Sequence, residues 1–238
     1  MMKISSTLKA SVFLLICHFA MTGNAQTTEQ ISKKFRINVL TGLALPYGEL
    51  GSKHFNYGGY AIYGNSSAIE GIWQFCPNLA AGLSFSFSRF PFDENTYAQD
   101  LVNSDPFMDM VYMKSDPYEV LTYTTAIYYN KSIWKKFSLT GKLGGGIMWA
   151  QTPDQLFNAT YFGVPNRGYK ITPSRDTKFA FSAGIACDYQ LFNQVDLSFY
   201  SNYYLADMAF GFKTPTTTYV RKLTFSYINA GVGIGFVF

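Results

Sequence analysis

Residues 227–238, Tyr-Ile-Asn-Ala-Gly-Val-Gly-Ile-Gly-Phe-Val-Phe, decide the fold of this chain. Successive side chains of a β-strand point to opposite faces, so the stretch separates into two faces. One face is continuous hydrocarbon and holds Ile228, Ala230, Val232, Ile234, Phe236 and Phe238. The other face is small or polar and holds Tyr227, Asn229, Gly231, Gly233, Gly235 and Val237. The alternation predicts a strand with one bulky apolar face and one narrow face.

The same two-residue period recurs upstream. It is found in residues 35–45, 60–75, 79–89, 121–130, 137–149, 178–191 and 195–205. The segment 60–75 fits least well, because Asn65 and Ser67 fall on its apolar face. We expect a β-bulge to reset the register there.

The connections between these segments alternate in length. Short turns are expected at 76–78, 131–136 and 192–194, and long loops at 46–59, 90–119, 151–177 and 206–222. This alternation is typical of an up-and-down barrel in an outer membrane, with short periplasmic turns and long outer loops. The sequence therefore predicts an all-β fold, an eight-stranded antiparallel transmembrane β-barrel over residues 35–238.

A secreted β-sandwich or a lipocalin-like barrel is the soluble alternative, with its apolar side chains inside. Here the polar face is also the small face, as the narrow interior of an eight-stranded barrel requires. A water-soluble barrel that exposed the bulky apolar face would aggregate. The membrane barrel is therefore favoured.

The first 25 residues read as a secretory signal peptide. Lys3 and Lys9 precede an apolar stretch at 10–20, and Gly23-Asn24-Ala25 supplies the small residues of a cleavage site. Residues 26–34 are then a periplasmic lead into the barrel. Of the three cysteines, Cys76 and Cys187 remain after cleavage, and we expect both to be unpaired thiols.

Composition excludes several other classes. Aromatic residues make up 18% of the chain and charged residues only 14%, which argues against disorder and against a helical bundle. The formal charge of +4 is small and dispersed, so no nucleic-acid partner is expected.

With these features the chain resembles the small outer-membrane β-barrel proteins of Gram-negative bacteria. It is similar in plan to the OmpA-type transmembrane domain, and its signal end and Tyr/Phe-rich strands look like barrel families of Bacteroidota. The resemblance implies an outer-membrane location among lipid and lipopolysaccharide. It also implies that Phe238, with Phe236, Ile234, Val232 and Ala230 on alternate positions, is the signal read by the barrel-assembly machinery. Nothing follows Phe238, so the peptidoglycan-binding domain of full OmpA-type proteins is not expected.

Residues that could carry catalysis are scarce. The mature chain has one histidine, His54, and no cluster with metal-ligand spacing, so no catalytic, metal or cofactor residues are predicted. Lipid A deacylases of the outer membrane use a His-Ser pair on late strands, which this chain lacks. Lipid A palmitoyltransferases place a histidine and an Asp-Ser pair in the first two outer loops. His54 in the first loop, with Ser104, Asp105, Ser115 and Asp116 in the second, keeps this enzyme as a remote alternative.

Charged residues on the narrow face are expected to point into the lumen. They are Arg36, Glu70, Lys142, Lys178, Asp188 and Asp196. Buried charges must be paired, and Lys142 and Asp188, on adjacent strands, could pair. A salt-bridged plug that fills the barrel is the favoured interpretation, and a gated ion path is the alternative.

The second long loop carries a run of acids: Asp93, Glu94, Asp100, Asp105, Asp109 and Asp116. It also holds aromatic residues and methionines, and its length suits a functional loop that binds a protein partner, calcium or the lipopolysaccharide surface. A mobile acidic surface loop is the plainer interpretation. We therefore expect a non-enzymatic barrel with a structural or surface-interaction role, for which a place in an envelope assembly is one option. The alternative is a narrow conduit for small hydrophobic molecules, resembling the OmpW-type barrels.

Overall fold

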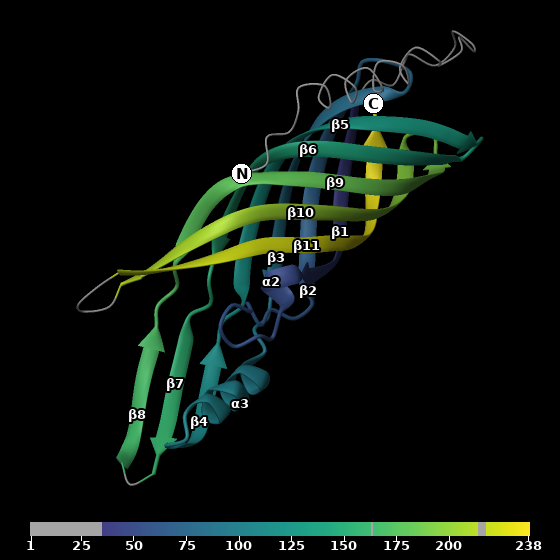
Figure 1. Ribbon diagram of the computed structural model, residues 1–238. Helices are drawn as coiled ribbons and strands as arrows, with labels where there is room; N and C mark the ends of the chain where they lie inside the picture. Colours follow the sequence, from purple (N-terminus) through teal and green to yellow (C-terminus); the bar gives the residue numbers. More distant parts are fainter. Residues whose placement is uncertain (1–34, 163, 214–217) are drawn as a thin grey trace. The chain divides into compact units, whose positions relative to one another are not determined.

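The computed structural model describes residues 35–162, 164–213 and 218–238. The expected signal peptide and periplasmic lead lie outside these residues. Eight strands close into a barrel (Figure 1). They are β1 (Phe35–Tyr47), β2 (Gly64–Gln74), β3 (Leu79–Phe90), β5 (Tyr118–Trp134), β6 (Phe137–Gln151), β9 (Arg175–Phe192), β10 (Val195–Lys213) and β11 (Thr218–Val237).

Every barrel strand pairs with the strands next to it in the barrel order, and β11 closes the barrel against β1. All of these pairs are antiparallel. The predicted eight-stranded up-and-down barrel is thus confirmed. We call the end that holds the short turns 75–78, 135–136 and 193–194 the turn end, and the opposite end the loop end.

The weakest predicted strand differs from its prediction. β2 begins at Gly64, and its pairing with β1 and with β3 runs without a register shift, so the expected bulge is absent from it. Asn65 and Ser67 simply face outward in line with Ile69. They lie near the loop end, where an outer surface meets polar headgroups and need not be apolar.

The long loops contain regular structure that the sequence did not predict. The second loop forms helix α3 (Glu94–Ser104) and strand β4 (Met108–Ser115), and the third forms β7 (Gln155–Tyr161) and β8 (Val164–Ile171). These three strands make a separate antiparallel sheet in the order β4-β7-β8 (Figure 1). A short helix, α2 (Gly48–Gly51), lies in the first loop.

The predicted fourth loop, 206–222, is mostly strand. β10 and β11 stay paired from Val195↔Phe236 to Lys213↔Thr218, although β10 leaves β9 after Leu205 and β11 leaves β1 after Ser226. The hairpin therefore continues past its neighbours at the loop end. Its inward side chains Met208, Phe210, Leu223 and Phe225 are buried, so this extension contributes to the core.

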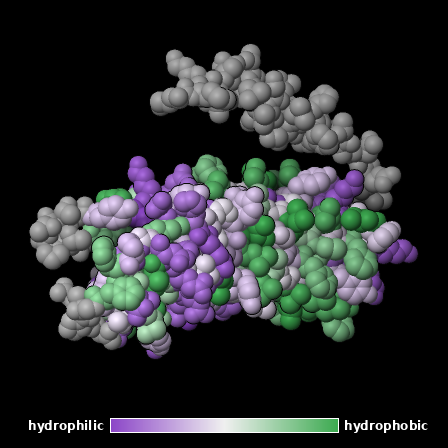
Figure 2. Space-filling view, turned by 60° about the horizontal axis from the view of Figure 1, so that its bottom comes forward, coloured by the Kyte–Doolittle hydropathy of each residue, from purple (hydrophilic) through white to green (hydrophobic). Residues whose placement is uncertain are grey.

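The outer surface of the barrel is apolar. Large exposed side chains on the strands include Val39, Leu43, Ile69, Leu83, Phe85, Ile127, Leu143, Ile147, Phe179, Phe181, Phe199, Val232 and Ile234. Figure 2 shows hydrophobic residues gathered on the right of the view and hydrophilic residues near its middle. Because a closed barrel satisfies its backbone hydrogen bonds internally, such a surface suits a bilayer.

Side chains at the two ends of the barrel mark the bilayer boundaries. Exposed aromatic residues ring the turn end: Phe35, Trp73, Phe75, Tyr129, Trp134, Phe192 and Phe238. Near the loop end the guanidinium groups of Arg89 and Arg175 lie over the rings of Phe87 and Trp149. None of the helices among the described residues has the length and hydropathy to span a membrane.

Candidate functional site: the lumen and its extracellular cap

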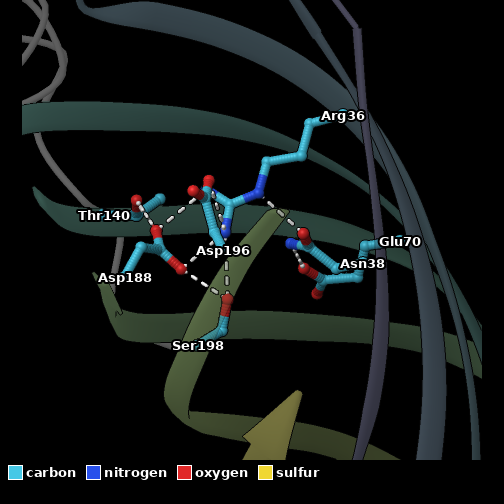
Figure 3. A network of polar contacts seen from close by, with 7 residues as sticks. All are labelled: Arg36, Asn38, Glu70, Thr140, Asp188, Asp196 and Ser198. Carbon is cyan, nitrogen blue, oxygen red and sulfur yellow. Dashed lines mark hydrogen bonds and ion pairs between the residues drawn. The ribbon is translucent and has the colours of Figure 1, made fainter. Parts of the chain in front are cut away.

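Arg36 is the centre of a polar network near the turn end (Figure 3). Its guanidinium donates two hydrogen bonds to the Asp188 carboxylate, Nη1 to Oδ2 at 3.0 Å and Nη2 to Oδ1 at 2.7 Å. Nη2 also lies 3.7 Å from Oδ2 of Asp196. Asp188 accepts further hydrogen bonds from Thr140 Oγ1 (2.9 Å) and Ser198 Oγ (2.5 Å). This bidentate pair joins β1 and β9 in the interior, and such geometry is the stronger form of ion pair.

Lys142 and Glu70 form the second ion pair of the lumen. Lys142 Nζ lies 2.5 Å from Glu70 Oε1, and each side chain is only 6% exposed. Asn38 connects the two pairs, since its Oδ1 accepts from Arg36 Nε at 2.7 Å and its Nδ2 donates to Glu70 Oε2 at 3.4 Å. The structure thus places five of the six expected lumen charges in one network. Lys178 takes no part in it, because its side chain is 47% exposed and its Nζ lies 3.7 Å from Asp176 Oδ2. The pairing of Lys142 with Asp188 that the sequence allowed is not found, because each of these residues has a different partner.

Glycines on the facing strands leave room for these long side chains. A Cβ atom at Gly235 would lie 2.7 Å from Arg36 Nε and 2.6 Å from Asn38 Oδ1. A Cβ atom at Gly184 would lie 2.9 Å from Lys142 Cε and 2.1 Å from Asn202 Oδ1. The small residues on the inner faces of the strands therefore leave the space that the charged network occupies.

The lumen around this network is almost filled. The cavity bounded by the ion pairs, Tyr128, Tyr200 and Asn202 has a volume of about 20 Å³. A cavity needs roughly 10–15 Å³ to hold one water molecule. Toward the loop end, Thr122 Oγ1 and Tyr227 OH lie 2.9 Å apart.

An apolar core closes the lumen at the loop end. One cluster joins barrel side chains to side chains of the first loop and of the extra sheet. The barrel contributes Ala44, Phe90, Val120, Met148, Ala180 and Tyr204, the first loop Leu50 and Tyr60, and the extra sheet Met113 and Phe157. The Tyr118 hydroxyl donates to Gly59 O at 2.8 Å, and Arg221 Nη2 donates to Gly58 O at 2.5 Å. The first loop is thereby held in the mouth of the barrel.

Tyr60 lies at the centre of the cap, which consists of the first loop, α3 and the β4-β7-β8 sheet, and its own backbone conformation is unusual. Its φ of 54° lies in the left-handed region, which is rare for a side chain this large. Its ring meets that of Tyr97 edge to face at 4.9 Å, and its hydroxyl donates to Asp100 Oδ2 at 2.6 Å. Burial and the Asp100 carboxylate raise the pKa of Tyr60 above its ordinary value. Sequence reasoning missed this residue, since neither a positive φ nor a loop contact has a periodic pattern.

The acidic loop is an ordered part of the cap, and most of its carboxylates have local partners. Asp93 caps α3 by accepting from Thr96 N and pairs with Lys53 Nζ at 2.5 Å. Glu94 accepts from Ser115 N at 2.7 Å, Asp100 from Tyr60 OH, and Asp105 from Phe107 N at 3.0 Å. Asp109 and Asp116 are exposed. The run of acids is therefore not one solvated anionic surface.

The residues considered for enzyme chemistry are not assembled. The His54 ring stacks on Tyr57 at 4.0 Å. Ser104 Oγ donates to Leu101 O, and Ser115 Oγ donates to the backbone of Asp116. Among the described residues no group of three or more His, Cys, Asp or Glu is placed to hold a metal ion. Cys76 and Cys187 are free thiols, as expected.

The extra sheet has one packed face and one open face. Met108, Val111, Met113, Phe157 and Ala159 are buried in the cap core. On the other side Met110, Tyr112 and Leu156 are 61%, 70% and 51% exposed. Both segments that form this sheet connect barrel strands at the loop end, so these apolar side chains lie outside the membrane-spanning barrel.

Solved structures with a similar fold are small outer-membrane barrels. Neisserial surface protein A is 13% identical, with a TM-score of 0.49 over 86% of this chain and 97% of that one. Ail, the attachment invasion locus protein of Yersinia pestis, is 13% identical, with a TM-score of 0.45 over 87% and 100%. A major outer membrane protein from Thermus thermophilus is 10% identical, with a TM-score of 0.47 over 85% and 99%.

No protein-family model matches the sequence, and no curated protein matches it either. The chain is built for the outer membrane of a Gram-negative bacterium, by its closed antiparallel barrel and its apolar outer surface.

The Lys142–Glu70 pair gives a stability prediction. Lys142→Met leaves the Glu70 carboxylate buried without its cation, so we expect the free energy of unfolding to fall by about 3–5 kcal/mol. The double variant Lys142→Met/Glu70→Gln removes both charges and is expected to recover more than half of that loss. Urea unfolding in lipid vesicles measures the free energy of unfolding of the natural protein, the single variant and the double variant. Lys178→Met, at an exposed lysine, is the control, and a loss no larger than the control's would contradict a buried pair.

Asp93 gives a pH prediction. Burial alone raises the pKa of this carboxyl group, but the Lys53 ammonium and the hydrogen bonds from Thr96 outweigh it and bring the pKa below the ordinary 3.8. The folded protein favours the charged form of Asp93. The contribution of Asp93 to folding stability is therefore complete above pH 3.8, and it is lost as the pH falls through the lower pKa that Asp93 has in the folded protein. We expect hydrogen exchange of α3 amides, corrected for intrinsic rates, to accelerate below that pH. Asp93→Asn should flatten the acid dependence, whereas Asp109→Asn should preserve it.

Proposed function

We propose that this protein is a non-enzymatic outer-membrane surface protein that binds a macromolecular partner through the open face of the β4-β7-β8 sheet. The observation that carries the proposal is the exposure of Met110, Tyr112 and Leu156 outside the barrel. Exposed apolar side chains on the barrel strands contact lipid, but these three side chains lie outside the bilayer and need another explanation. The face is mixed, since Asn158 lies in register with Tyr112 and Lys114 with Leu156, and exposed tyrosine and methionine are enriched at protein interfaces.

The cap gives this face a rigid support. Phe157 stacks on Tyr169 at 4.6 Å, and its other neighbours belong to the core that continues into the barrel. A face held on regular secondary structure loses little conformational entropy when a partner binds. The nearly filled lumen is consistent with this role, because it leaves the outer surface as the part of the molecule free to act.

Three finer assignments accompany the proposal. The alternating apolar residues from Ala230 to Phe238 line the outside of β11, which supports their role as the signal for the barrel-assembly machinery. The assignment to barrel families of Bacteroidota, and a place in an envelope assembly, rest on the sequence resemblance alone.

Site-specific photo-cross-linking on intact cells tests the partner surface. A photoreactive phenylalanine analogue at position 112 should yield a discrete cross-linked species, because Tyr112 projects from the open face. The same analogue at Tyr219, an exposed residue of the β10–β11 extension, is the matched control. In a second step, Met110→Ser/Leu156→Ser should remove the product at position 112. Equal products at 112 and 219, or a product that survives the double variant, would refute the assignment of this face.

A narrow conduit for small hydrophobic molecules is the second candidate. It is favoured by the apolar, methionine-containing upper lumen, where Met148 and Met208 are buried, since methionine side chains repack readily.

Conductance and uptake separate this candidate from the first. Under our proposal the purified protein gives no stepwise currents in planar bilayers and does not accelerate entry of a hydrophobic dye into vesicles. Dye entry that is rapid in the natural protein and slowed by Ala150→Phe, which places a large side chain in the upper lumen, would favour the conduit instead.

A further inference from the structure

A groove crosses the lipid-facing surface of β2, β3, β5 and β6. Its volume is about 630 Å³, and its lining is mostly apolar. The groove follows from residue size, since Ala81 lies in register between Trp73 and Ile127, and Gly71 lies opposite Leu83. Two small residues among these large ones create a depression in the outer surface.

The β5 edge of the β5–β6 hairpin extends beyond β3 beside this groove, whereas β6 stays paired with β9 as far as Phe137. The pairing of β5 with β3 ends at Tyr129, whereas its pairing with β6 continues to Trp134 (Figure 1). Lys131, Lys135 and Lys136 are exposed on this extension. The sequence contains no acidic residue between Glu119 and Asp154, so the hairpin itself offers these amines no carboxylate.

The lysines and the groove are close together. Ile127, Tyr129 and Lys131 share the outward face of β5. Four residues of strand span about 13 Å, so the Lys131 ammonium begins roughly that far from the groove lining, toward the turn end. Past Asn130 the β5 edge of this hairpin has left β3, and a strand edge without a partner belongs outside the hydrocarbon, at the depth of the headgroups. Cationic side chains therefore meet the headgroup layer at the point where the apolar groove ends.

We propose that this surface binds one anionic phospholipid of the periplasmic leaflet. An acyl chain lies in the groove between Trp73 and Ile127, and the phosphodiester is held by the lysines of the β5–β6 hairpin. Charge complementarity selects the anionic lipid, and Trp134 and Tyr129 supply the aromatic contacts expected at an interface. The inference requires only that the turn end faces the periplasm, and it is independent of the extracellular partner surface.

Tryptophan fluorescence provides the readout. Of the three tryptophans, Trp73 lines the groove and Trp134 lies on the hairpin, so the Trp149→Phe protein reports from this region alone. The protein is reconstituted in phosphatidylcholine vesicles, and brominated phosphatidylglycerol or brominated phosphatidylcholine is added as quencher. Each lysine near an anionic surface is worth roughly fivefold in binding. We expect phosphatidylglycerol to occupy the site at least about tenfold more readily than phosphatidylcholine.

Two variants divide the site into its parts. Lys131→Gln/Lys135→Gln/Lys136→Gln should abolish the preference for phosphatidylglycerol while quenching by phosphatidylcholine persists. Ala81→Leu fills the groove and should weaken quenching by both lipids. The control Lys114→Gln/Lys178→Gln/Lys222→Gln removes three exposed charges elsewhere and should keep the preference. Gel migration without heating verifies that each barrel is folded.

Several outcomes would overturn the proposal. One is equal quenching by the two lipids in the Trp149→Phe protein. Another is a preference that survives the hairpin variant, or that the control variant loses equally, since either result means general electrostatic attraction. Displacement of the lipid by millimolar glycerol phosphate would show that the lysines hold a free phosphate group without the acyl chain.

Discussion

Closure of the barrel between its first and last strands is the constraint on which the rest of the structure depends. β1 and β11 pair from Arg36↔Val237 to Tyr47↔Ser226, so backbone donors and acceptors along both strands find partners inside the protein. In hydrocarbon an unpaired strand edge would cost several kcal/mol for each unsatisfied group. Closure in turn fixes which face of every strand is narrow, because eight strands enclose a space only wide enough for side chains.

The side chains in the narrow interior change in chemical type from the turn end to the loop end. Ion pairs occupy the turn end, hydroxyl and amide groups the middle, and hydrocarbon the loop end. Such pairs are expensive to desolvate, and apolar replacements of similar volume are often at least as stable. The charged side chains connect strands across the lumen. One network joins β1, β2, β6, β9 and β10 through Arg36, Asn38 and Lys142.

The barrel could be predicted because its pattern is local. A two-residue period is visible within ten residues, and the side-chain size on each face identifies the lumen. The partner of Lys142 could not be predicted, because it depends on the stagger of strands that are far apart in sequence. The same holds for the extra sheet, in which β4 pairs with β7 across the whole of β5 and β6. Asn38 lay on the predicted inner face two residues after Arg36, and this spacing was the available signal for its contact with Arg36.

The core that runs from the upper lumen into the cap has a consequence for how the protein can diverge. Outer loops of a barrel usually accept substitutions and insertions freely, because little else depends on them. Here Leu50, Met113 and Phe157 belong to the same packed cluster as Met148 and Tyr204 of the barrel. Exposed positions that lie off the proposed partner face, such as Ser104 at the end of α3, can therefore change freely, whereas the inner face of the sheet must change in step with the barrel. The interior of the cap is inherited with the barrel that it closes.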